Sequence, residues 1–263
     1  MTTAALLRTE GLTLRYGRFT AVHDVSIELQ AGRRYGVLGP NGAGKTSLLN
    51  LLTGTHRASA GRILLDGVDI TAHGPEQRRH AGLGRSFQKT SVFSELTVLD
   101  NLRLAVQSDQ GLRLFNPWSP RAHDKHLSAR ARAFAAQVGL SEKQDSLASA
   151  LSYGELRQLE IGLALATEPR VLLLDEPTAG MSEEETQAIV AMLRSQLPAR
   201  LTLLIIEHDL RVIESLTDHV FVFDGGALFE QGTPEQIRQS DRVQRIYFKG
   251  DVKGDVQGEK AHA

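Results

Sequence analysis

Residues 39–46 read Gly39-Pro40-Asn41-Gly42-Ala43-Gly44-Lys45-Thr46, and this loop sets the architecture of the chain around it. It follows a short apolar run, Tyr35 to Leu38, and precedes leucines at helical spacing, so the sequence predicts a strand, a loop and a helix. Glycines let successive backbone N–H groups turn toward phosphate oxygens, and the positive end of the helix dipole assists them. The segment therefore predicts a phosphate-binding loop in an α/β fold.

Side chains at the end of this loop carry its chemistry. Lys45 is placed to reach the β- and γ-phosphates of a nucleotide, and the hydroxyl of Thr46 to ligate Mg²⁺. Ser47 follows them and joins the residues expected to bind ATP. A glycine-rich turn could match the pattern by chance, but the strand before it and the leucine-rich helix after it argue against that alternative.

Two acidic residues follow a second aliphatic run, Val171 to Leu174. A parallel sheet presents ligand-binding groups at the carboxyl ends of its strands, which is where Asp175 and Glu176 stand. Asp175 is suited to hold Mg²⁺ through water, and Glu176 to act as the general base on the attacking water. Taken alone, an acidic pair after a strand fits a helix N-cap equally well. Together with the phosphate-binding loop, it predicts a hydrolase site.

Apolar patterns predict the remaining elements. Alternation predicts antiparallel strands around Leu12, Leu14 and Tyr16, and again around Val25, Ile27 and Leu29. The Ala-, Leu- and Arg-rich region 98–166 predicts helices, interrupted by a loop at 116–120. Further strand-like runs lie at 62–65, 203–206, 220–223 and 228–230, with a helix expected at 183–196. Strands that alternate with helices predict a parallel sheet with covered faces.

Composition excludes several classes of protein. The 263 residues include 30 basic and 31 acidic side chains, so no net field draws the chain to nucleic acid or anionic lipid. The apolar runs are far shorter than the ~20 residues of a membrane-spanning helix. Zero cysteines exclude disulfides, thiolate metal sites and cysteine nucleophiles. Residues 1–8 lack the pattern of a secretory signal, so a cytosolic location is expected.

The segment Leu151-Ser152-Tyr153-Gly154-Glu155 precedes an apolar-patterned helix. By itself it reads as a helix start, with Ser152 as the cap and an acidic residue in the first turn. Its residues, and its position between the phosphate-binding loop and the Asp175-Glu176 strand, resemble the signature motif of ABC-transporter ATPases.

Three further residues extend this resemblance over residues 6–232. Tyr16 resembles the aromatic residue on which the family stacks adenine, and Gln88 the glutamine that senses Mg²⁺ and the attacking water. His208, after an aliphatic strand, resembles the switch histidine that contacts the γ-phosphate. Each alone reads as an ordinary strand aromatic, a loop residue or a polar cap, but the family order of all the motifs argues against coincidence.

The resemblance implies a P-loop NTPase of the ABC ATPase fold, with a mixed core sheet, an antiparallel β subdomain and a helical subdomain. The expected ABC ATPase domain spans 1–250, ahead of a flexible tail at 251–263. Its expected parts are a RecA-like core at about 1–88 and 167–232, a helical subdomain at about 89–166 and a C-terminal helical extension at about 233–250.

The resemblance also implies a mechanism in which two such subunits face head to tail. The phosphate-binding loop of one and the Ser152, Gly154 and Glu155 segment of the other then clamp one ATP with its Mg²⁺. One segment departs from the family. Where the family commonly has Ser-Ala-Leu-Asp, this chain has Ala179-Gly180-Met181-Ser182, without the aspartate behind the usual cross-dimer contact.

The variant loop, with the sequence around Gln88 and His208, resembles the subfamily serving high-affinity uptake of branched-chain amino acids. That implies an ATPase at the cytoplasmic face of the inner membrane, working with two transmembrane permease subunits, a second and often different ATPase subunit, and an extracytoplasmic binding protein. Urea or short amides are alternative substrates, because close relatives import them. An exporter-type ATPase, or a soluble ABC ATPase acting on ribosomes or DNA, is a less favoured alternative, and no nucleic-acid partner is expected.

A local basic cluster has no place in these motifs. Its residues are Arg121, His123, Lys125, His126, Arg130 and Arg132. A solvated helix face explains it better than a contact with lipid headgroups or a membrane subunit. The two histidines, three residues apart with Asp124 between them, lack the further ligands at metal-site spacing that would complete a site, so no structural metal is expected.

Overall fold

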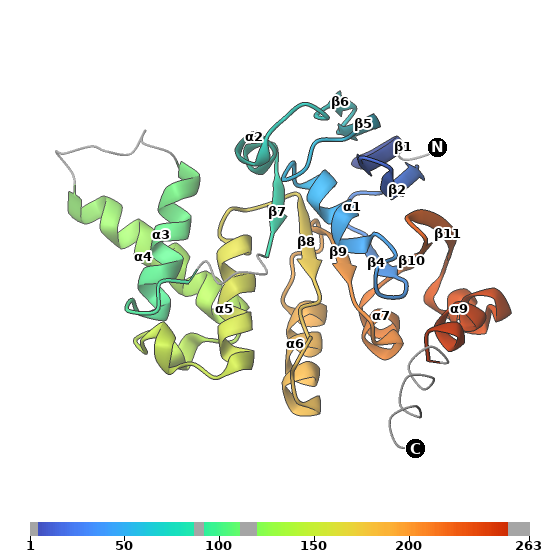
Figure 1. The fold of residues 1–263 in the computed structure, drawn as a ribbon. Coiled ribbons are helices and arrows are strands. Elements are labelled where there is room, and N and C mark those ends of the chain that lie inside the picture. Colours follow the sequence, from blue (N-terminus) through green and yellow to red (C-terminus); the bar gives the residue numbers. More distant parts are fainter. Residues whose placement is uncertain (1–4, 87–91, 111–119, 252–263) are drawn as a thin grey trace, which may run out of the picture. The chain divides into compact units, whose positions relative to one another are not determined.

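A computed structural model describes residues 5–86, 92–110 and 120–251 of the chain (Figure 1). The chain divides into two compact units. The first comprises residues 1–72 and 205–263, and the second residues 73–204. No helix within the described ranges is long and apolar enough to cross a membrane.

An antiparallel sheet occupies the N-terminal part of the first unit. Its strand order is β2-β1-β5-β6, and β3 pairs with the start of β1 on the side opposite β5. The strands are β1 (Leu7–Tyr16), β2 (Phe19–Val25), β3 (Glu28–Leu29), β5 (Ala60–Leu65) and β6 (Val68–Asp69). The antiparallel pairing predicted here is confirmed, but the run at 25–29 is not one strand, because Val25 ends β2 and Leu29 belongs to β3.

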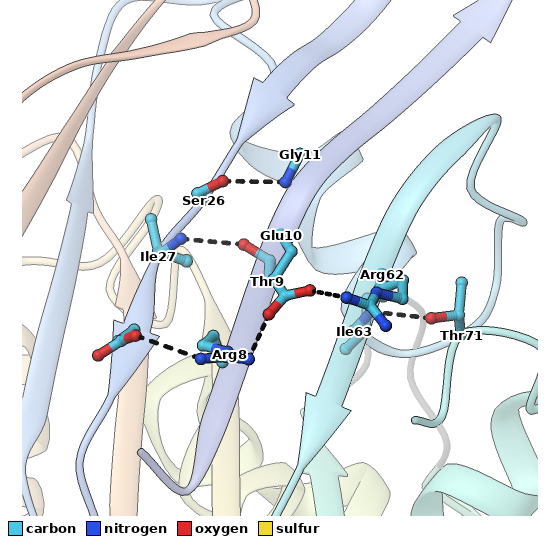
Figure 2. A network of polar contacts seen from close by, with 10 residues as sticks. Arg8, Thr9, Glu10, Gly11, Ser26, Ile27, Arg62, Ile63 and Thr71 are labelled. Atoms are coloured by element: carbon cyan, nitrogen blue, oxygen red, sulfur yellow. Dashed lines mark hydrogen bonds and ion pairs between the residues drawn. The ribbon is translucent and has the colours of Figure 1, made fainter. Parts of the chain in front are cut away.

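Polar side chains join the strands of this sheet (Figure 2). Thr9 is only 1% exposed, and its hydroxyl donates to the Val25 carbonyl at 2.9 Å while accepting the Ile27 N–H at 3.0 Å. The Ser26 hydroxyl accepts the N–H of Gly11 at 2.9 Å. These bonds satisfy backbone groups between the β1–β3 pairing at Leu7 and Arg8 and the β1–β2 pairing that begins at Leu12, and buried backbone groups require such partners.

Charged side chains lie across β1 and β5 in the same view (Figure 2). Glu10 accepts from Arg62 at 2.6 Å and also pairs with Arg8. A second carboxylate, Glu28, lies 4.0 Å from Arg8. Because these side chains are 30–62% exposed, solvent screens each pair, which stabilises the sheet by about 1 kcal/mol at most.

A mixed sheet in the first unit carries the phosphate-binding loop. β4 (Arg34–Leu38) pairs parallel with β10 (His219–Asp224), which pairs antiparallel with β11 (Ala227–Gly232). β4 is buried along most of its length and leads through the loop into α1 (Lys45–Leu52). The strand, loop and helix predicted around residues 35–52 are confirmed, as are the strands predicted at 220–223 and 228–230, which pair as a hairpin.

Helices complete the first unit. They are α7 (Leu210–Leu216), α8 (Pro234–Gln239) and α9 (Asp241–Asp251). Each of the first two has a side-chain N-cap, Asp209 for α7 and Thr233 for α8. The last two helices lie where the C-terminal helical extension is predicted.

The second unit begins with α2 (Pro75–His80) and β7 (Leu83–Arg85), followed by α3 (Val98–Gln110), α4 (Pro120–Gln137) and α5 (Tyr153–Leu165). Two short 3₁₀ turns, η2 (Ser141–Lys143) and η3 (Ala148–Ala150), precede α5. The interrupting loop predicted near 116–120 lies outside the described residues, except for the residue that begins α4.

A buried cluster joins α3, α4 and the end of α5 in the second unit. It contains Val106 of α3, Leu127 of α4 and Ala166 at the end of α5, with Ala105 and Phe134 packed against it. Burial of such apolar side chains stabilises the helices more than their intrinsic propensity does.

The rest of the second unit is β8 (Val171–Asp175), α6 (Glu183–Ser195) and the start of β9 (Thr202–Ile206). β7 and β8 pair in parallel, in agreement with the predicted parallel strands. Every residue of β8 is buried, as expected for a strand covered on both faces. β8 therefore delivers Asp175 and the residues after it from a fixed support.

Candidate active site

The phosphate-binding loop is closely supported by neighbouring backbone. A Cβ added at Gly39 would lie 2.3 Å from the Phe223 carbonyl oxygen, and one at Gly44 would lie 2.4 Å from the Ala21 carbonyl oxygen. Gly44, the N-cap of α1, also has a left-handed backbone with φ of 95°. Glycine is therefore required at both positions for space as well as conformation.

Lys45 lies across the loop that precedes it. Its side chain is buried, and Nζ donates to the carbonyls of Gly39 at 2.6 Å and Pro40 at 3.1 Å. The first turn of α1 holds no acidic residue, so the positive end of the helix dipole is available to an anion. Thr46 and Ser47 are half-buried in the same turn. Glycine N–H groups, an ammonium and two hydroxyls are groups that bind phosphate.

Two more candidate residues lie in the first unit. Tyr16 ends β1 with 48% of its surface exposed, and its ring meets that of His56 edge-on at 5.9 Å between centroids. His208 is exposed just after β9. The capping residue of α7 is its neighbour Asp209, which accepts the N–H of Arg211 at 2.8 Å. The N-cap of α7 is therefore Asp209 and not the His208 side chain.

Asp175 ends β8 and is 1% exposed. The guanidinium of Arg85, on β7, donates to its Oδ2 at 3.1 Å. Burial raises the pKa of Asp175, and the positive charge of Arg85 partly opposes that rise. Within the described part of the chain, Oδ1 of Asp175 has no hydrogen-bond partner. A buried carboxylate oxygen without a donor fits a hard cation such as Mg²⁺, which prefers oxygen ligands.

Glu176 follows in an unusual backbone conformation, with φ of 48°. Non-glycine residues rarely adopt left-handed angles, and such conformations cluster at functional sites. Its side chain is half-buried, whereas Pro177 after it is buried. Arg157 of α5 donates hydrogen bonds to the backbone carbonyls of this turn.

The first turn of α5 is a capping box. Ser152 accepts the N–H of Glu155 at 3.2 Å, and the Glu155 carboxylate accepts the N–H of Ser152 at 2.9 Å. The hydrogen bond from the Ser152 N–H lowers the pKa of Glu155. The helix start predicted from the sequence is confirmed.

The same turn is also bonded to the loop that departs from the family pattern. Gly154 donates its N–H to Glu185 at 3.2 Å, and the Tyr153 hydroxyl donates to the Ala179 carbonyl at 3.2 Å. Glu185 is itself in the capping box of α6, whose N-cap is Ser182. One carboxylate therefore joins the starts of two helices within the second unit.

The sequence-predicted residues fall into two groups. The first unit holds Tyr16, His208 and the loop at 39–47, and the second holds Asp175, Glu176 and residues 152–155. Gln88 lies outside the described residues.

Sequence reasoning missed Arg157 and Glu185. The spacing of Arg157 and Glu160 predicts an ordinary i,i+3 surface ion pair, whereas both side chains are only 12% exposed. Glu185 carried a usable signal, because Ser182 and Glu185 have capping-box spacing.

Comparison with known proteins places these observations in a family. A model described as ABC transporter matches residues 22–179. The branched-chain amino acid transport ATP-binding protein BraF of Pseudomonas aeruginosa is 36% identical, with 92% of this chain and 97% of BraF covered. LivG of Escherichia coli, a protein of the same description, is 37% identical over the same shares.

Solved structures agree with these relatives. The ADP conformation of MJ1267, an ATP-binding cassette of an ABC transporter, matches with a TM-score of 0.81 and 30% identity, covering 94% of this chain and 99% of that one. A nucleotide-free cassette from an ABC transporter gives a TM-score of 0.80, also at 30% identity, with 93% and 99% covered. The predicted α/β fold of an ABC ATPase is therefore confirmed.

Proposed function

Because this chain belongs to the ABC transporter family and is an ATP-binding ATPase, we propose that it powers the uptake of branched-chain amino acids through separate membrane permease subunits. The observation that carries the proposal is the glycine-rich loop packed at the start of α1, with Lys45 lying across it. The printed descriptions of the relatives supply the substrate class. Their similarity extends over most of both chains, well beyond the nucleotide motifs.

The groups proposed to hold the nucleotide itself belong to the first unit. The loop N–H groups and Lys45 hold the phosphates, with Ser47 beside them, and Tyr16 stacks on adenine. Thr46 and Asp175 hold Mg²⁺, whose charge neutralises the phosphate oxygens when it is bound. This assignment is supported by Oδ1 of Asp175, which has no hydrogen-bond partner within the described residues, and by Thr46, which is half-buried in the first turn of α1.

Hydrolysis uses Glu176 as the general base. A water oxygen attacks the γ-phosphorus as the bond to the bridging oxygen breaks, and the carboxylate takes the water proton, giving ADP and phosphate. His208 contacts the γ-phosphate, and Gln88 orients the water and the metal. The left-handed backbone of Glu176 supports this role, because strain of that kind persists where function requires it.

The subunit works as one of a pair at the cytoplasmic face of the membrane. Ser152, Gly154 and Glu155 of each subunit close on the nucleotide held by the other, and hydrolysis loosens the pair. The partners are two permease subunits, a second ATPase subunit and, indirectly, an extracytoplasmic binding protein. The division into a RecA-like core and a helical subdomain at 89–166 is part of this proposal, and α3, α4 and α5 lie within that range.

ATP turnover of the reconstituted transporter tests the proposal. The subunit is co-purified with its native permease subunits and binding protein, reconstituted in lipid, and assayed with leucine, isoleucine, valine, urea and short amides. Stimulation of ATP turnover by the branched-chain amino acids supports the proposed importer. Stimulation by urea or an amide alone would mean that this compound, and not a branched-chain amino acid, is the transported substrate. Turnover independent of every added solute and of the binding protein would contradict import. Glu176→Gln should bind ATP with near-normal affinity yet hardly hydrolyse it.

A further inference from the structure

The guanidinium of Arg157 donates hydrogen bonds to the turn that carries Glu176. Nη2 donates to the carbonyl of Asp175 at 2.8 Å and to that of Glu176 at 3.3 Å, and Nε donates to the carbonyl of Pro177 at 3.3 Å. On its own helix, Nη1 donates to Glu160 at 2.7 Å. One side chain of α5 therefore bonds three consecutive carbonyls and is itself held by a carboxylate.

The turn needs such support. Glu176 has φ of 48°, an angle that costs a non-glycine residue free energy and persists only where the surroundings impose it. Burial of Asp175 and Pro177 on either side shields the turn from water that could bind the carbonyls instead. Arg157 supplies the missing donors, so its hydrogen bonds form when the turn has this conformation.

Arginine suits this task better than lysine. Its planar guanidinium presents five N–H donors in a rigid fork and is always charged, whereas an ammonium is a compact point charge on a flexible stem. The side chain is 12% exposed, as is that of Glu160, so little solvent competes for its donors. The fork therefore fixes the orientation of the turn as well as its position.

We propose that Arg157 is a positioning residue for ATP hydrolysis, which holds the Asp175-Glu176-Pro177 turn so that the Glu176 carboxylate is aimed at the attacking water. The inference rests on the proposed role of Glu176 as the general base. In this role Arg157 acts through the turn and not directly on the nucleotide or the attacking water. Its effect falls on the chemical step, because a displaced base loses rate while the phosphate-binding groups of the first unit keep their contacts.

Steady-state kinetics of Arg157→Met and Arg157→Lys test this role. We expect kcat to fall about 10- to 100-fold in Arg157→Met while KM for ATP changes less than about twofold, as for a base displaced by a fraction of an ångström. Arg157→Lys should recover part of kcat, because an ammonium can bond one or two of the carbonyls. Arg130→Met is the control, since Arg130 pairs with the Glu168 side chain at 2.8 Å and should leave kcat unchanged.

A double variant separates positioning from general loss of structure. If Arg157 acts through Glu176, Arg157→Met should cause no further loss in a Glu176→Gln background, whereas a general structural defect would lower the residual rate again. Full kcat in Arg157→Met, or a rise in KM as large as the fall in kcat, would overturn the inference. If Arg157→Met fails to fold, kcat of Arg157→Lys becomes the test. A wild-type kcat in that variant would contradict the positioning role of Arg157. High turnover in Glu176→Gln alone would instead refute the proposed base.

Discussion

Replacing Arg85 with methionine should expose how strongly the buried carboxylate of Asp175 depends on its counter-ion. The two side chains are 12% and 0% exposed, and their charged atoms lie 3.1 Å apart. At an effective dielectric constant of about 20, two unit charges at this distance attract by roughly 5 kcal/mol. Removing one partner of a buried pair costs about 3–5 kcal/mol, because the other charge stays buried and uncompensated. We expect Arg85→Met to lower the free energy of unfolding by about 3 kcal/mol.

Urea unfolding of the nucleotide-free protein in EDTA, followed by far-ultraviolet circular dichroism, measures this loss. Arg103→Met is the matched control, because Arg103 pairs with Asp100 at a similar 3.3 Å but with side chains that are 32% and 45% exposed. It should cost less than about 1 kcal/mol. The double variant Arg85→Met/Asp175→Asn removes the stranded charge and should recover most of the loss. A loss no larger than that of the control, or no recovery in the double variant, would refute the reasoning.

The same pair of residues predicts a pH dependence. Burial raises the pKa of Asp175 above its ordinary value, and loss of Arg85 should raise it further. A raised carboxyl pKa means that the folded state binds the proton of Asp175 more tightly than the unfolded chain does. Protonation of Asp175 therefore stabilises the folded state at low pH, and this stabilisation is lost as pH rises through the folded pKa. The free energy of unfolding that Arg85→Met loses relative to wild type, measured in urea, should therefore become smaller as the pH is lowered from 7 toward 5.

Other predictions concern the sheet, the phosphate-binding loop and the cap of α5. Thr9→Val removes a hydroxyl that bonds two buried backbone groups and should lower the free energy of unfolding in urea by about 1–3 kcal/mol. The control, Arg62→Met in the same sheet, should lower it by less than about 1 kcal/mol. Lys45→Ala should weaken ATP binding at least tenfold by fluorescent-nucleotide titration, and unchanged affinity would remove Lys45 from the site. The Ser152 N–H lowers the pKa of Glu155, so its carboxylate adds stability that is lost as pH falls through that pKa. Glu155→Gln keeps the acceptor oxygen, and its urea midpoint should fall less than that of wild type below about pH 5.

The sequence predicted those features that depend on local pattern. The strand, loop and helix at 35–52 and the helix start at Ser152 follow from spacing within a few residues. The pairing of Arg85 with Asp175, 90 residues along the chain, could not be predicted because it depends on β7 lying beside β8. Arg157 was missed for a related reason, since no pattern within α5 reveals which backbone carbonyls lie against that side of the helix.

The support of the phosphate-binding loop also has a consequence for synthesis of the chain. The loop leaves β4, whose neighbour β10 supplies the carbonyl against Gly39, and Gly226 just beyond β10 donates its N–H to Ala43 at 3.1 Å. Arg34 at the start of β4 and its partner Asp218 are 184 residues apart. At about 5–20 residues per second, a ribosome needs roughly 10–40 s to translate that interval. A nascent chain therefore carries its complete phosphate-binding sequence long before the backbone that shapes it has been made.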